Sequence, residues 1–453
     1  MIDNDTIKIA NAQAFWGDRS NAASELVEQV VDLDFLTLDY LAEVSMSILA
    51  IQKEKDSSKG YAQDFLEVIS SLVDQWKKNP RLKLVTNAGG LNPIGCAEAC
   101  KILLQNSGIS NIKIGVVSGD DVLHELKTSN ANSYPNLDTN QSIGEVQEKL
   151  ETANTYIGSK PIVDALRAGA QIVITGRVAD PCLTAAPCIA HFGWDWSDYN
   201  RIASAIIAGH LIECGTQVTG GFSTHWMDYP DMDFPGYPVI EMHRNGTFVV
   251  TKPENTGGIV NIETVKEQLL YEIGDPDNYL CPDTTVSFLS LKLDELAKNR
   301  IQVSGAIGNP PPKNYKVSAT YKDGYRIEGM ITIFGRNCRD KALRCGEIVL
   351  KRLKKCGYNP IEYHVECLGT GDVVPSVYQS DTLETVLRIS AKDQSKDSLI
   401  QLSKEIAPLV TSGPQGTTGY MSGRPKIRPV YSFWPTLIEN RKVNPQVHII
   451  EVK

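Results

Sequence analysis

The sequence offers its clearest candidate for chemistry in a histidine and a glutamate three residues apart. His210 and Glu213 lie in the segment GHLIECG at 209–215, and on a helix this spacing places both side chains on one face. A carboxylate beside an imidazole raises the imidazole pKa and fixes its tautomer, as a general base requires. Two alternatives stay open: the pair could supply two ligands to a divalent metal, or His210 could be a buried, hydrogen-bonded histidine without a chemical role.

Further polar candidates follow short apolar runs in the first 180 residues. The five loops contain FWGD at 15–18, Asp39 with Glu43, NAGGLNP at 87–93, GDD at 119–121 and GRVAD at 176–180. Ligands of open α/β sheets bind outside the carboxyl ends of the strands, so we expect these loops to converge on one pocket. Turn chemistry is the alternative, because Gly, Asn and Asp are common in tight turns. The acidic residues expected to face the pocket are Asp18, Asp39, Glu43, Asp120, Asp121 and Asp180.

An anionic substrate would find two candidate binding features in these loops. Gly89 and Gly90 precede an expected helix start at Pro93, where free N–H groups favour a carboxylate or phosphate. Arg177 could clamp such an anion with two parallel hydrogen bonds, or pair with Asp180 as a structural ion pair. Two TGG segments permit close backbone approach to a ligand. The predicted substrate-binding residues are Asp18, Asp39, Glu43, Asn87, Gly89, Gly90, Asn92, Arg177, Gly220, Gly221, Lys252, Gly257 and Gly258.

The predicted catalytic residues combine the histidine pair with three of the aspartates. His210, oriented by Glu213, would move a proton next to a carbonyl group. Asp120, Asp121 and Asp180 would position water or a divalent cation such as Mg²⁺, with electrostatic stabilisation of an enolate. The sequence contains no HExxH, GxSxG or CxxC motif, so zincin, serine hydrolase and zinc-finger chemistry lack support. No metal-binding residues are assigned from the sequence.

The elements that must position these residues alternate between strands and helices up to about residue 285. Strands are expected at 7–10, 33–38, 82–86, 112–117 and 171–175, and helices at 21–30, 40–53, 61–77, 93–105 and 161–168. This alternation predicts an α/β fold with a mostly parallel, doubly wound sheet. Beyond residue 285, a hairpin candidate at 315–334 and helices at 340–355 and 398–410 indicate an α+β module. We therefore expect two domains, 1–285 and 286–453.

Composition excludes several other classes of protein. The 453 residues carry a formal charge of −9, with 42% hydrophobic and 22% charged residues, as in ordinary globular domains. A net acidic chain is a poor nucleic-acid binder and is not attracted to an anionic membrane surface. No secretory signal is recognised, and the most apolar stretch, at 202–212, is too short to cross a bilayer. We expect a cytoplasmic protein whose ten cysteines are reduced.

Eleven motifs in a fixed order resemble the acyclic terpene utilisation (AtuA-type) family. They are FWGD at 15–18, DYLAEV at 39–44, TNAGGLNP at 86–93, GDD at 119–121, TGRVAD at 175–180, FGW at 192–194, GHLIECG at 209–215, TGG at 219–221 and 256–258, QLLYE at 268–272 and PD at 282–283. The resemblance is dense over about 5–290 and looser beyond. It implies a cytoplasmic protein of isoprenoid acid breakdown, where intermediates travel as CoA thioesters. It supplies no established reaction.

Three functions follow as expectations. The first is a lyase or hydratase acting on a branched carboxylate or its CoA thioester. The second is a non-catalytic ligand-binding or assembly subunit that acts with a small companion protein, because relatives carry such a domain and this chain ends at Lys453 without room for it. The third is a divalent-metal hydrolase built on the carboxylates. A homo-oligomer is compatible with all three, and no nucleic-acid or membrane partner is expected.

Overall fold

The computed structural model describes residues 5–42, 44–375, 382–420 and 423–453. Glu43, a predicted binding residue, lies outside the described residues. The chain forms two compact units, Met1–Thr320 with Trp434–Lys453 and Tyr321–Phe433. The first unit contains the whole of a ten-stranded sheet and its helices, and the second contains a smaller helix-covered sheet.

Five parallel strands form the centre of the large sheet. Their order is β1 (Thr6–Asn11), β2 (Phe35–Leu38), β3 (Lys83–Thr86), β6 (Ile172–Thr175) and β4 (Ile112–Ser118). Antiparallel strands extend both edges: β7 (Val239–His243), β8 (Phe248–Thr251), β12 (Arg300–Ser304) and β11 (Lys292–Ala297) beyond β1, and β19 (Gln446–Val452) beyond β4. The sheet is therefore mixed, and the expectation of a mostly parallel one is corrected, because short connections turn β7 back on β8 and β11 back on β12.

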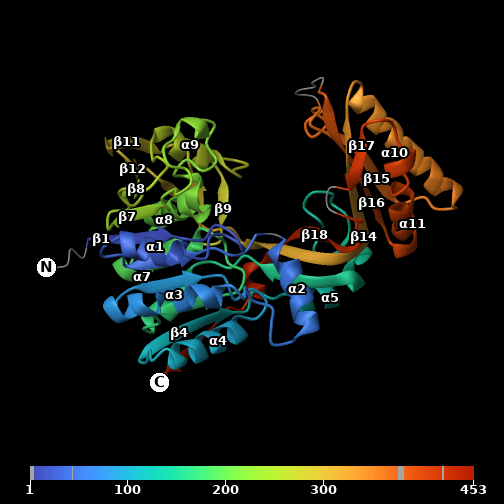
Figure 1. Ribbon diagram of the computed structural model, residues 1–453. Helices are drawn as coiled ribbons and strands as arrows, with labels where there is room; N and C mark the ends of the chain where they lie inside the picture. The colour runs from blue at the N-terminus through green and yellow to red at the C-terminus, as the bar shows by residue number, and fades with distance from the viewer. Residues whose placement is uncertain (1–4, 43, 376–381, 421–422) are drawn as a thin grey trace. The chain divides into compact units, whose positions relative to one another are not determined.

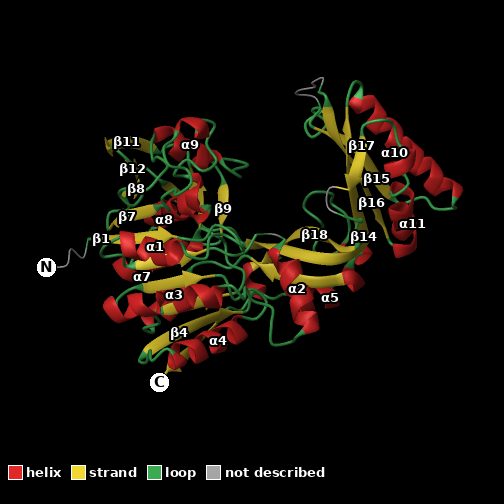
Figure 2. Ribbon diagram, in the orientation of Figure 1, coloured by secondary structure: helices red, strands yellow, loops and turns green. Residues whose placement is uncertain are grey.

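Both faces of the central strands are buried. Alternate residues of a strand point to opposite faces, and in β2 Phe35 joins one apolar cluster whereas Leu36 and Leu38 join the other. Helices pack on both faces of the sheet and contribute to both clusters (Figure 2). They are α1 (Ala22–Gln29), α3 (Phe65–Lys78) and α4 (Pro93–Asn106) in one cluster, and α6 (Lys160–Arg167), α7 (Cys182–Phe192) and α8 (Tyr199–Glu213) in the other.

Shorter elements complete the first unit. They are α2 (Ser45–Lys55), α5 (Leu123–Thr128), β5 (Leu150–Thr155), α9 (Ile262–Leu270), and the small antiparallel sheet of β9 (Tyr279–Cys281), β10 (Thr284–Ser287) and β13 (Ile307–Asn309). The strand at 150–155 had no sequence signal. It pairs with β14 (Asn314–Phe334), a partner more than 150 residues away, and such a pairing leaves no local pattern.

The second unit packs two helices on one face of an antiparallel sheet. Its strands are most of β14, β15 (Glu362–Leu368), β16 (Glu384–Asp393), β17 (Thr417–Tyr420) and part of β18 (Arg428–Glu439). Its helices are α10 (Cys338–Lys355), α11 (Lys396–Ile406) and the single turn α12 (Leu409–Ser412). Figure 1 shows α10 and α11 beside β15 and β16. The prediction of a hairpin at 315–334 is wrong, because β14 continues through the expected turn as one strand. Every residue of its second part, Tyr325–Phe334, pairs with β16.

The compact units divide at residue 320 and not near 285. Residues 286–320 join the first unit because β12 pairs with β8 in the large sheet. The C-terminal strand β19 returns to the same sheet beside β4. Long-range strand pairing, which sequence periodicity does not report, therefore sets this division.

Helices α7 and α8 meet at a glycine. A Cβ atom on Gly209 of α8 would lie less than 3.0 Å from backbone atoms of Pro181, and backbone cannot move aside cheaply. We expect Gly209→Ala to lower the free energy of unfolding by about 1–3 kcal/mol. The matched control is Gly274→Ala, which meets no atom within 4 Å and should cost less than about 0.5 kcal/mol. Equal urea unfolding curves for the two variants would contradict this packing argument.

Candidate functional site

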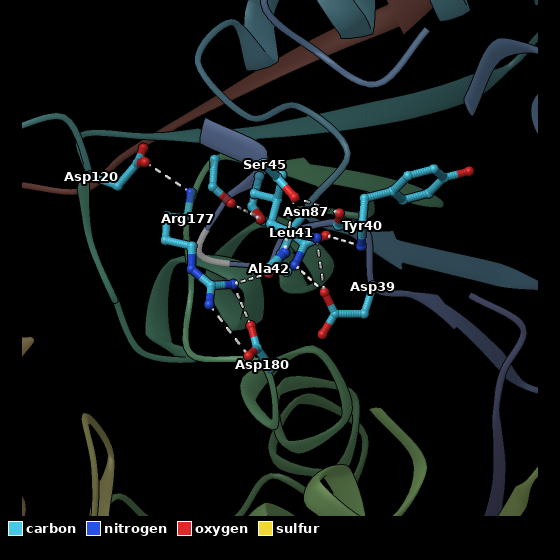
Figure 3. A network of polar contacts seen from close by, with 11 residues as sticks. Asp39, Tyr40, Leu41, Ala42, Ser45, Asn87, Asp120, Arg177 and Asp180 are labelled. Atoms are coloured by element: carbon cyan, nitrogen blue, oxygen red, sulfur yellow. Dashed lines mark hydrogen bonds and ion pairs between the residues drawn. The ribbon is translucent and has the colours of Figure 1, made fainter. Parts of the chain in front are cut away.

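Arg177, in the loop after β6, is the centre of a buried polar network (Figure 3). Its side chain is 1% exposed. Nη1 donates to the Leu41 carbonyl oxygen at 2.8 Å and also to Asp180, and Nη2 lies 3.4 Å from the second Asp180 oxygen. The guanidinium stacks over the Tyr156 ring at 4.0 Å. Arg177 therefore forms an ion pair with Asp180 inside the protein. Of the two roles expected from the sequence, anion clamp or ion pair, the structure has the ion pair.

Asp39 and Asn87 join the ends of β2 and β3. Asn87 Nδ2 donates to Asp39 Oδ1 at 2.7 Å, and Asn87 Oδ1 accepts the Tyr40 N–H at 2.7 Å. Both side chains are buried. Burial, followed by the nearby Asp180 carboxylate, raises the pKa of Asp39 well above its usual range. Asp39 is therefore a buried acid whose surroundings disfavour its ionised form.

Asp120 links the end of β4 to the same network. Its Oδ2 accepts the Arg177 backbone N–H and the Asn154 Nδ2, each at 2.8 Å. A Cβ atom on Gly176 would collide with this carboxylate, so a glycine at 176 lets the β6 loop approach Asp120. Burial raises the pKa of Asp120 to about 6, although both N–H contacts lower it.

His210 and Glu213 do lie together on α8, as their spacing predicts. His210 Nδ1 lies 3.0 Å from Glu213 Oε1, and Nε2 lies 2.9 Å from the Gln268 carbonyl oxygen. A carbonyl oxygen only accepts, so Nε2 carries a hydrogen. Burial lowers the pKa of His210 to about 4. The expectation that Glu213 raises this pKa is therefore wrong, because desolvation outweighs the carboxyl group.

Glu213 is the complement of this neutral histidine. Burial, then the carboxylates of Asp180 and Glu272, raise the pKa of Glu213 well above its usual range. With the imidazole neutral, a protonated Glu213 donates to Nδ1, which orients the carboxyl group. Its other oxygen, Oε2, is buried without a hydrogen-bond partner among the described residues. An acid with one free oxygen, close to the partly exposed Asp180 side chain, is an arrangement suited to proton exchange.

Two of the predicted acidic residues, Asp18 and Asp121, are engaged in contacts close to them in the fold. Asp121 caps the Leu123 N–H at 2.9 Å, so Asp120, Asp121 and Asp180 do not form a carboxylate metal site in the described part of the chain. Asp18 accepts from the Ala14 N–H and the Tyr237 hydroxyl and so fixes a turn. Both are corrections with one reason: short acidic side chains satisfy local backbone N–H groups.

The loop at 87–93 is likewise occupied by its own contacts. The N–H groups of Gly90, Leu91 and Asn92 donate to carbonyl oxygens within the protein. Asn92 caps α4 by accepting the Gly95 N–H at 3.0 Å. A Cβ atom on Gly89 or Gly90 would collide with neighbouring atoms. In this structure the loop packs tightly, and the expected anion cradle is not open.

The two TGG segments pack against each other and against nearby backbone. A Cβ atom on Gly257 would meet the Asp231 carbonyl, and one on Gly258 would meet the Thr219 carbonyl. Gly220 and Gly221 are similarly enclosed, by Tyr229 and Thr216. Lys252 donates to Thr256 at 2.7 and 3.0 Å. These contacts hold the two segments together, and the binding role expected for them stays a prediction.

Two cavities lie away from the Arg177 network. One of about 420 Å³ includes Arg19, Tyr237, Thr256 and Gly257 in its lining. Three acidic residues (Glu25, Asp231 and Asp233) outnumber its arginine, which disfavours an anionic ligand. The other, about 490 Å³, is a groove in the second unit that contains none of the predicted site residues.

Sequence reasoning missed several partners in the network. Tyr156 lies under the Arg177 guanidinium, Asn154 holds Asp120, and Gln268 holds His210 at both its ring and its carbonyl. Gln268 lies within the QLLYE motif, which was a usable signal. Asn154 lies near the end of β5 and Tyr156 lies just beyond it. The local sequence gave no signal for either residue.

The fold and the buried polar network indicate the class of protein, a mixed α/β protein with polar groups at the ends of its parallel strands. Acidic side chains and a buried arginine meet at the carboxyl ends of β2, β4 and β6, the position at which mixed α/β proteins place their ligand sites. The family model described as acyclic terpene utilisation family protein AtuA matches residues 7–449. The chain belongs to this family and is thereby linked to acyclic terpene utilisation. No curated protein and no solved structure matches it.

The described residues contain no helix that is both long and apolar enough to span a bilayer.

Asp120 allows a test of the buried network by pH. Its pKa of about 6 in the folded chain exceeds the unfolded value of about 3.9. The stabilising effect of its protonation is thus complete below about pH 4 and is lost as pH rises through about 6. Asp120→Asn keeps an oxygen for both N–H donors. Relative to the unmodified chain, we expect its free energy of unfolding to rise by about 2–3 kcal/mol from pH 4 to 7.

Urea unfolding at a series of pH values measures this difference directly. Asp121→Asn is the matched control, because the neighbouring Asp121 carboxylate is exposed. A constant difference between Asp120→Asn and the unmodified chain across the range would contradict a raised pKa at Asp120.

Proposed function

We propose that the chain is an acid–base enzyme of the lyase or hydratase type that acts on a branched isoprenoid acyl group. The observation that carries this proposal is Glu213: a buried carboxyl group with a raised pKa, held by His210 through one oxygen and unpartnered at the other. Buried polar side-chain atoms without a hydrogen-bond partner are uncommon in folded proteins, and each calls for an explanation. Membership of the acyclic terpene utilisation family agrees with a branched acyl substrate.

The proposed roles divide between proton transfer and positioning. Glu213 exchanges a proton with the substrate carbon next to the carbonyl. His210 acts as a positioning residue, because both its ring nitrogens are engaged. Asp180, whose side chain is 31% exposed, is the base that activates water at the mouth of the site, and Arg177 fixes its orientation. This replaces His210 as the general base.

Hydration of a conjugated double bond balances with these groups. Asp180 takes a proton from water, the resulting hydroxide adds to the β-carbon, and Glu213 delivers its proton to the α-carbon. The proton on Asp180 then returns to Glu213 through solvent, so that the net addition is one water molecule. Dehydration is the reverse sequence.

The charges of the site favour a CoA thioester over a free carboxylate. The carboxylates of Asp180 and Glu213 raise the pKa of Asp39, and that of Asp180 raises the pKa of Glu213. Arg177 is already committed to Asp180. A substrate carboxylate would therefore meet like charge without a free guanidinium. A thioester brings an uncharged carbonyl to the same place, with the phosphates of CoA kept distant. We propose no metal for this step.

Glu213→Gln tests the proposal. The amide keeps the size of the side chain but cannot transfer a proton, so we expect hydration of a 3-methyl-branched 2-enoyl-CoA to fall at least 100-fold. The assay follows loss of the conjugated thioester absorbance and, in D₂O, deuterium at the α-carbon. Glu347→Gln, at an exposed carboxylate of α10, is the matched control and should retain full activity.

His210→Gln separates positioning from proton transfer. We expect it to shift the pH profile of kcat while leaving measurable turnover, because Glu213 loses its orienting partner and keeps its proton. Full activity of Glu213→Gln would sink the proposed role of Glu213. If the unmodified chain binds the thioester without turning it over, alone or with a companion protein, the non-catalytic binding subunit is the better description.

A further inference from the structure

Two cysteines and an aspartate form a separate cluster. Cys182 is the first residue of α7, Cys281 is the last of β9, and Asp283 follows two residues later. Cys182 Sγ lies 3.8 Å from Cys281 Sγ and 3.3 Å from Asp283 Oδ2. One ligand atom from each of the three lies within 4.8 Å of the others, and the described part of the chain contains no other such group.

These separations match the edges of a tetrahedral metal site. With metal–sulfur distances of about 2.3 Å and a tetrahedral angle, two thiolates stand about 3.8 Å apart. A thiolate and a carboxylate oxygen at about 2.0 Å from the metal stand about 3.5 Å apart. The observed 3.8 and 3.3 Å therefore need almost no movement to accept a metal. We propose that Cys182, Cys281 and Asp283 bind one zinc-type divalent cation.

The surroundings hold the third ligand in place. The backbone N–H of Ser159 donates to both oxygens of Asp283, at 3.0 and 2.9 Å. A hydrogen bond from the protein to a ligating group is the usual way in which metal ligands are oriented. The cluster is buried, with Cys182 0% and Asp283 9% exposed, so neither thiol exchanges freely with solvent.

The ligand set also indicates which metals fit. Two thiolates are soft ligands that select zinc or similar ions over Mg²⁺ or Ca²⁺. Burial raises the pKa of the Cys182 thiol. Binding of the cation replaces the two thiol protons, which are released, and leaves a net charge of −1 on the three ligands and the metal. Three protein ligands leave one coordination position for water or substrate, as in catalytic zinc sites.

The test uses the full chain, purified without chelator, and elemental analysis. We expect about one zinc per chain, and a sulfur-to-cobalt charge-transfer band after exchange with Co²⁺. Cys281→Ser and Asp283→Asn should lower the affinity for Zn²⁺ at least tenfold. Cys188→Ser is the matched control: Cys188 is equally buried on the same helix, but its Sγ contacts the Thr184 carbonyl. This variant should bind metal like the unmodified chain.

The proposed metal site does not depend on the proposed function, because the experiment measures bound metal and not turnover. The Co²⁺ spectrum of the unmodified chain decides the matter even where a variant does not fold. Absence of both zinc and a charge-transfer band, after incubation of the reduced chain with Zn²⁺ or Co²⁺, would overturn it. So would a titration that finds two thiols missing in the metal-free chain, because Cys182 and Cys281 would then be a disulfide.

Discussion

The buried guanidinium of Arg177 is the constraint on which the site depends. Removing a charge from water costs on the order of several kcal/mol. Only well-oriented ion pairs and hydrogen bonds offset that cost. Asp180, the Leu41 carbonyl and the Tyr156 ring supply that pairing, while the backbone N–H of Arg177 holds Asp120. One residue therefore connects the loops after β2, β4 and β6 with the residue that follows β5. The glycine at 176 and the tight loop at 87–93 are consequences, because the strands' ends must approach closely for a single side chain to reach them all.

A second consequence is electrostatic. Arg177 can neutralise one carboxylate, and it is committed to Asp180. Asp39, Asp120 and Glu213 share the region with no further cation in direct contact in the described structure, and burial raises the pKa of each. The site is therefore better described as a set of buried acids than as a network of salt bridges. The same reasoning explains the neutral imidazole of His210. A proton on the imidazole would leave both His210 and Glu213 charged in a buried place, whereas a proton on the Glu213 carboxyl group leaves both neutral.

The sequence predicts the central strands and the convergence of their loops well, because buried parallel strands are short apolar runs and their carboxyl ends share an edge. Asp39, Asn87, Asp120 and Arg177 meet for that reason. The failures have two physical causes. Asp18, Asp121 and Asn92 are polar loop residues whose side chains accept hydrogen bonds from neighbouring backbone N–H groups. In the sequence such residues look the same as residues that bind a ligand. The pairings of β5, β14 and β19 are long-range, and local periodicity contains no record of the partner. The opposing pKa directions of His210 and Glu213 depend on burial, which spacing alone cannot give.

Strand β9 connects the acid site with the cysteine cluster. Tyr279 and Cys281 are two apart on one strand, so their side chains point to one face. The Tyr279 ring centroid lies 6.0 Å from that of His210, and burial followed by the charges of Glu213 and Cys281 raises the pKa of Tyr279. A divalent cation at Cys281 would therefore act on the acid site through packing. It would fix β9, and with it the ring that packs on His210. The net charge would stay the same, because the two thiol protons released on binding balance the charge of the cation.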